Sequence, residues 1–193
     1  MNIPPRFLFP ILLLGTLLSS TGVWAGKPDK SVEKTIKTVL TSVRYGKDSI
    51  AVKKIDFDKM AELSMGESWK DVSPADRKKL SSGIQTITEK LSFPKGRDLF
   101  KHLDAILYDA PRVTKDNAHL KTTIVVHRNY KKQEMVIDFI LYRGPNGWKI
   151  VDTVILGEST LEGFYEDQIE PLLDKGGIPA VMAALDARLN KLK

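Results

Sequence analysis

The sequence contains no cysteine, so disulfide bonds and thiol chemistry are not available to it. The same absence excludes a lipoprotein, because there is no cysteine to acylate. With 193 residues, the chain is long enough for one domain that is held together by a hydrophobic core. A domain of about this size can bury roughly 70% of the surface that its unfolded chain exposes.

Residue patterns of catalytic and metal centres are also missing. The segment 157–159 lacks the second glycine of a nucleophile elbow. Gly176-Gly177 precedes an expected helix, so we interpret this pair as a turn between two helices and not as a phosphate-binding loop. The histidines at 102, 119 and 127 do not have the spacing of a metal site. We therefore expect no catalytic residue, no metal and no cofactor.

Long apolar runs are missing except near the N-terminus. Residues 7–18 form an apolar stretch that follows Arg6, but a helix that spans a bilayer needs roughly 20 residues. Val23 and Ala25 stand three and one residues before a plausible cleavage point. This pattern predicts a signal peptide over residues 1–25, export from the cytoplasm and a mature domain over residues 26–193. A short membrane anchor is the alternative.

The charge of the mature chain is mildly basic. Residues 26–193 contain 29 basic and 24 acidic residues, a net charge of +5. The basic residues are scattered along the chain with acidic residues between them, and an exported protein has little access to nucleic acid, so we expect no nucleic-acid partner. The charge fits transient contact with an anionic membrane surface. The alternative is a solvated surface that serves only solubility.

The N-terminal half has the periodicity of helices. Apolar residues recur three and four positions apart before Gly46, a short helix is expected over 56–64, and Ser73-Pro74 begins a longer one. We expect the longer helix to end at the Phe93-Pro94 step. The apolar positions of the first and third helices are Val32, Ile36, Val39, Leu40, Val43, Leu80, Ile84, Ile87 and Leu91.

The second half alternates with the period of strands and ends in two helices. Helices are expected over 160–174 and 179–192, with Val181 on the apolar stripe of the second. The fold class that follows is α+β, with a curved antiparallel sheet of about four strands flanked by helices. The expected strands cover residues 103–109, 118–128, 133–143 and 147–156.

The turn at 144–147 sets a register for the last two strands. If Arg143 pairs with Trp148, then Phe139 faces Asp152. In the same register, Ile137 faces Val154. One face of this hairpin is then apolar, and the other is mixed and only partly covered. The apolar face contains Met135, Ile137, Phe139, Leu141, Trp148, Ile150, Val154 and Leu156.

This register places Asp152 on the apolar face, where two interpretations are open. A carboxylate within a cone of sheet and helices could act as the general base of an isomerase of the ketosteroid type. Alternatively, Asp152 accepts hydrogen bonds from backbone N–H groups as a structural residue. We favour the structural role, because no second acid or tyrosine is visibly paired with it.

Short segments along the mature chain match, in order, the motifs of one known family. They are residues 56–61, Gly66, Trp69 and residues 73–77, 136–139, 147–152, 157–159 and 176–178. Together they resemble the MlaC family of periplasmic phospholipid-binding proteins, also called toluene-tolerance proteins. The resemblance implies an NTF2-like cone with a lipid cavity and no enzymatic activity.

The resemblance also implies partners and a cargo. A protein of this family carries a glycerophospholipid through the periplasm between an outer-membrane lipoprotein complex and an inner-membrane ABC transporter. A similar group is associated with hopanoid metabolism, so another lipid is an alternative cargo. A ligand-free adaptor with a filled core is a further alternative.

The apolar sheet face and the helical stripes together predict the lipid site. A face this apolar must be covered, either directly by helices or across a lipid-filled gap. The residues that we expect to contact lipid are Leu80, Ile84, Ile137, Phe139, Leu141, Ile150, Val154 and Val181.

Overall fold

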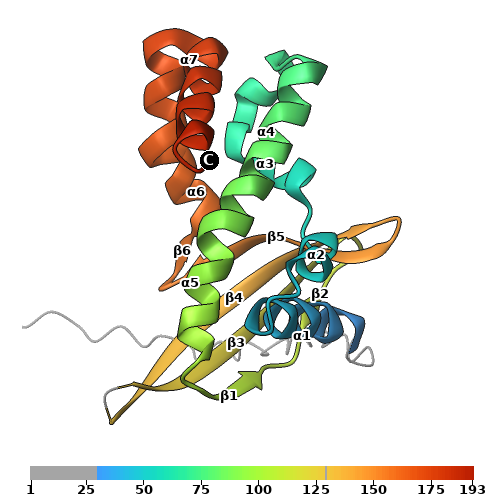
Figure 1. Ribbon diagram of the computed structural model, residues 1–193. Helices are drawn as coiled ribbons and strands as arrows, with labels where there is room; N and C mark the ends of the chain where they lie inside the picture. Colours follow the sequence, from blue (N-terminus) through green and yellow to red (C-terminus); the bar gives the residue numbers. More distant parts are fainter. Residues whose placement is uncertain (1–29, 129) are drawn as a thin grey trace, which may run out of the picture.

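The computed structural model describes residues 30–128 and 130–193, and it has the predicted α+β class with an antiparallel sheet and helices (Figure 1). The predicted signal peptide lies outside the described residues. Within the described ranges, no helix is both long and apolar enough to cross a membrane. The sheet and its helices are built from elements that follow the sequence expectations closely, with two corrections.

The sheet has the four long strands that the alternation predicts and two short ones. Its order is β1-β3-β4-β5-β6, with β2 paired to β3 beside β1. All neighbouring strands are antiparallel. The strands are β1 Leu103–Tyr108, β2 Arg112–Val113, β3 Asn117–Arg128, β4 Lys131–Gly144, β5 Gly147–Ile155 and β6 Glu158–Ser159.

The first helices form where the apolar spacing places them. Helix α1 (Lys30–Arg44) is followed by the short α2 (Asp48–Ala51) and a 3₁₀ turn. Helix α3 (Phe57–Met65) begins after Asp56, whose carboxylate accepts a hydrogen bond from the Lys59 backbone N–H at 3.1 Å. A side-chain acceptor at this position satisfies one of the free N–H groups of the first turn.

The predicted end of the long helix at Pro94 is wrong. Helix α4 (Pro74–Ile87) passes through a π-helical turn (Thr88–Ser92) into α5 (Phe93–Phe100), and Ser92 and Phe93 keep right-handed helical backbone angles. A proline cannot donate to the carbonyl four residues earlier and its ring crowds that carbonyl, so a wider turn lets the helix continue. Burial of Phe93 and Phe100 holds the continuation against the sheet.

The C-terminal helices meet at the predicted glycine turn. Helix α6 (Thr160–Phe164) continues through a π-helical turn (Tyr165–Ile169) into α7 (Glu170–Asn190). Gly176 and Gly177 interrupt α7 with non-helical backbone angles, and Gly177 has a φ of 62°. Because side chains rarely adopt that angle, the two glycines separate two helical segments.

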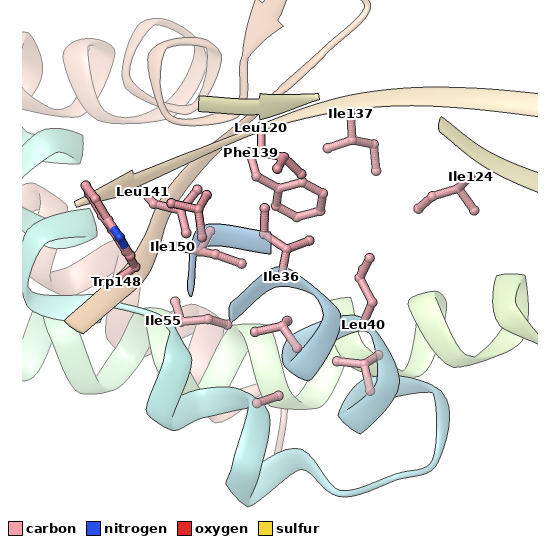
Figure 2. Close-up of a cluster of buried hydrophobic side chains, with 14 of the residues drawn as sticks. Ile36, Leu40, Ile55, Leu120, Ile124, Ile137, Phe139, Leu141, Trp148 and Ile150 are labelled. Atoms are coloured by element: carbon pink, nitrogen blue, oxygen red, sulfur yellow. The ribbon is translucent and has the colours of Figure 1, made fainter. Parts of the chain in front are cut away.

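The hydrophobic residues form two clusters. In the first, which we call the sheet core, α1 and α5 pack on one face of the sheet, and Figure 2 shows Ile36 and Leu40 of α1 beneath Leu120 and Phe139. The second, the helical core, joins α3, α4 and α7. It contains Ala61, Met65, Val72, Leu80, Ile169, Val181 and Met182. The long α4–α5 helix contributes to both cores.

The predicted register of the β4–β5 hairpin is correct near the turn and wrong beyond it. Arg143 pairs with Trp148 as expected, but a bulge after Ile150 shifts the pairing, so Phe139 faces Thr153 rather than Asp152. One extra residue in a strand reverses the faces of every residue after it. Asp152 and Val154 therefore lie on the face opposite Phe139.

Candidate functional site

The helical side of the molecule encloses a cavity of about 610 Å³. Its walls come from α3, α4, α6 and α7 and from the π-helical turn after α6, elements that lie together above the sheet in Figure 1. Ligand pockets typically measure roughly 300–1,000 Å³. The lining residues are Ala61, Ser64, Met65, Leu80, Ile84, Ile87, Phe164, Gln168, Ile169, Leu172, Val181, Ala184, Leu185, Ala187, Arg188 and Lys191.

Small side chains keep the space between these helices open. Ala61, Ala184 and Ala187 line the cavity where larger residues would fill it. At one level α4 and α7 approach closely, since a Cβ atom at Gly83 would lie 2.8 Å from a methyl carbon of Leu185. The helices are thus held together at Gly83, whereas the alanines leave a gap beside that contact.

The wall of the cavity is apolar and its rim is polar. The apolar wall combines aliphatic residues with Phe164, whereas Gln168, Arg188 and Lys191 are exposed to solvent. None of the described lining residues is acidic. An apolar interior with a cationic edge suits a molecule that has a large hydrocarbon part and a negatively charged polar part.

The structure divides the predicted lipid-binding residues between three places. Leu80, Ile84 and Val181 line the cavity. Four others point into the sheet core, and Val154 is partly buried on the opposite sheet face. The residues of the sheet core are Ile137, Phe139, Leu141 and Ile150. Because α1 and α5 pack directly on these four, lipid contact by this group remains a prediction that the geometry does not favour.

Sequence reasoning missed part of the cavity wall. Ala61 and Met65 are four residues apart on α3, a spacing that would have identified them as neighbours on one helix face. Ala184 and Arg188 extend the stripe of Val181 along α7 by the same rule. Periodicity shows which residues share a face, but it does not show that this face borders a gap.

Asp152 has a structural environment, as we favoured from the sequence. It is only 8% exposed, and its carboxylate accepts hydrogen bonds from Ser159 Oγ at 2.6 Å and from the backbone N–H groups of Thr153 at 2.7 Å and Leu161 at 3.1 Å. It does not line the cavity. The carboxylate fastens β5 to the start of α6, and it is not placed to accept a proton from a ligand in the cavity.

The histidines do not form a metal site. His119 lies 3.7 Å from Asp138, and His127 lies 3.6 Å from Asp104, so each pairs with one carboxylate on the sheet. In the part of the chain that the structure describes, no group of three potential ligands could hold a metal ion.

Comparison with solved structures gives a fold relationship. The phospholipid-binding protein from Ralstonia solanacearum, solved in complex with a phospholipid, aligns with a TM-score of 0.69 at 17% identity, over 86% of this chain and 99% of that chain. At this identity the likeness shows a shared fold alone. A variant of the protein Rd1NTF2_05 aligns over 65% of this chain and 96% of its own at 13% identity, and its TM-score of 0.39 is too low to establish a shared fold.

Comparison by sequence gives the family. No curated protein matches the chain at a significant level. The family described as MlaC protein matches residues 32–187, a range that begins within α1 and includes the whole sheet and most of the cavity wall. Because this range covers far more than half of the sequence, the chain belongs to the MlaC family.

Proposed function

We propose that this protein carries a phospholipid whose acyl chains occupy the cavity between α3, α4 and α7. As a member of the MlaC family it is a non-enzymatic component of Mla lipid transport. The observation that carries the assignment of the site is the apolar cavity of about 610 Å³ with a cationic rim. The phospholipid bound to the structural relative from Ralstonia solanacearum supports the same class of ligand.

The energetics of lipid transfer explain why such a carrier needs partners. Removing about 30 methylene groups from water is favourable by roughly 24 kcal/mol, at about 0.8 kcal/mol for each. A bilayer already shelters the same groups, so transfer from the membrane to the cavity gains almost nothing. The direction of transport must therefore come from the partners at the two membranes.

The family implies a periplasmic protein that works with the other Mla components. We propose more specifically that it receives and delivers lipid at an inner-membrane ABC transporter complex and an outer-membrane lipoprotein complex. In this scheme ATP hydrolysis by the transporter supplies the driving force. Contact with membrane surfaces is then brief, and the lipid is shielded by α3, α4 and α7 during transit.

The first prediction is that the purified protein contains lipid. Native mass spectrometry of protein folded in the cell should show a bound species, and extraction followed by fragmentation should identify a glycerophospholipid with two acyl chains. A hopanoid in its place would keep the carrier function and change the cargo. Protein that is uniformly empty, and that takes up no phospholipid from vesicles, would contradict the proposal.

The second prediction concerns export. The secreted form should begin at Gly26, because Val23 and Ala25 are the small residues that a signal peptidase accepts. The intact mass of protein from the periplasmic fraction measures this directly. As a control, Ala25→Arg should block cleavage and leave the precursor attached to the membrane. A mature protein that keeps residues 7–18 would contradict the export pathway.

A further inference from the structure

The two charged residues of the cavity lining carry the same sign and lie at the same helix end, Arg188 in the last turn of α7 and Lys191 as its C-cap. Arg188 and Lys191 are three residues apart at the C-terminal end of α7, so their side chains lie on one helix face. Both border the cavity and both are exposed to solvent. The edge of an otherwise apolar cavity therefore holds two positive charges within reach of one ligand.

Neither cation is neutralised by the residues around it. Within residues 30–128 and 130–193, the side chains of Arg188 and Lys191 take part in no ion pair. The nearest acid along α7 is Asp186, and its carboxylate is bound to Lys79 of α4 at 2.7 Å. The ion pair between Asp186 and Lys79 thus leaves the two rim cations free for an external anion.

We propose that Arg188 and Lys191 bind the phosphate group of the lipid whose acyl chains fill the cavity. This inference rests on the proposed function and adds the recognition of the head group. A guanidinium can donate two parallel hydrogen bonds to phosphate oxygens, and an ammonium adds a second charge without a fixed geometry. The exposed amide of Gln168 lies on the same rim and can contact the polar part of the head group.

If the two cations serve only to stabilise the end of α7, a different experimental result is expected. Positive side chains in the last turn of a helix interact favourably with its carbonyl end, whatever else is nearby. That role would affect the stability of α7, and it would not distinguish one lipid from another. A phosphate site would instead change the choice between lipids that have the same acyl chains and different head groups.

The test compares two lipids that have the same acyl chains and differ in the phosphate-containing head group. Lipid-free protein is incubated with vesicles that contain equal amounts of dioleoylphosphatidylglycerol and dioleoylglycerol, and native mass spectrometry measures the ratio of the bound species. The wild type should prefer phosphatidylglycerol, and R188Q/K191Q should reduce the bound ratio by about tenfold, the effect expected for losing charge-assisted bonds at an exposed site. The preference of the wild type should also fall as salt is raised.

A charge-matched control separates binding from general electrostatics. K78Q/K175Q removes two exposed positive charges from α4 and α7 at positions that do not line the cavity, and it should leave the ratio unchanged. An equal loss of both lipids in R188Q/K191Q, or an equal fall of the ratio in the two double variants, would overturn the inference. So would unchanged selectivity in R188Q/K191Q.

Inorganic phosphate is an alternative ligand for the same two cations, because it carries the same phosphate oxygens as the lipid head group. Inorganic phosphate at millimolar concentration should not displace bound phosphatidylglycerol, because the exposed rim cations alone provide little affinity. Displacement by phosphate would indicate an anion site that is independent of lipid and would overturn the inference. A wild type that takes up neither lipid would contradict the proposed function itself, which distinguishes that failure from a failure of head-group recognition.

Discussion

Ile84→Glu should empty the cavity while the protein stays folded, whereas Ile137→Glu should unfold it. Ile84 lines the cavity on α4 and is partly exposed, so a carboxylate at this position can remain hydrated. It would expel acyl chains, because a charge beside hydrocarbon is strongly unfavourable. Ile137 is 8% exposed and lies in the sheet core, where a carboxylate would be buried without a partner. Such a charge costs several kcal/mol, which is comparable to the stability of a whole domain.

Circular dichroism and native mass spectrometry measure the two effects. The Ile84 variant should keep the wild-type spectrum and lose at least nine tenths of its bound lipid, and Ile84→Leu should keep both. The Ile137 variant should lose the spectrum of the folded state. If Ile137→Glu folds normally and loses lipid, the ligand lies against the sheet face, and our placement of the lipid in the cavity between α3, α4 and α7 is wrong.

The contrast between these two isoleucines also shows what the sequence could predict. Alternation identified the apolar face of β4, and the three-and-four spacing identified the stripe of α4, so both residues were assigned to the lipid site. What separates them is the distance between the packed layers. Helix α1 lies directly on the sheet, whereas the small side chains of Ala184 and Ala187 leave part of the space between α7 and α4 unfilled. This difference in packing depends on how helices that are distant in sequence pack against each other.

The π-helical turn before Pro94 and the bulge in β5, which local patterns did not predict, share a cause. The π-helical turn before Pro94 persists because Phe93 and Phe100 are buried in the sheet core, and this tertiary contact overrides the local preference of proline to end a helix. The bulge near Val151 persists because Asp152 finds its donors on Ser159 and Leu161. In both places local patterns predicted the element correctly, and contacts made later in the chain decided its path.

The second large effect is a loss of stability that we expect when the hydrogen bonds of Asp152 are removed. Asp152→Ala should lower the free energy of unfolding by about 3–5 kcal/mol, because bonds to a carboxylate contribute roughly 1.5–3 kcal/mol each and the Leu161 N–H would be left buried without an acceptor. Asp152→Asn should cost less, about 1–3 kcal/mol. The amide keeps one oxygen for the two backbone N–H groups and can donate to Ser159 Oγ. Urea denaturation followed by circular dichroism measures both values.

A double-mutant cycle with Ser159 tests whether this contact joins the sheet to the helices of the cavity. Ser159 Oγ donates to Asp152 and also accepts from the Glu162 N–H as the N-cap of α6. Ser159→Ala alone should cost about 1–2 kcal/mol. Because the two side chains contact each other, the double variant should lose less than the sum of the single losses. Additive losses, or a loss below 1 kcal/mol for Asp152→Ala, would contradict the role of this carboxylate as the fastening between β5 and α6, and the helices that enclose the cavity would then depend on their own core alone.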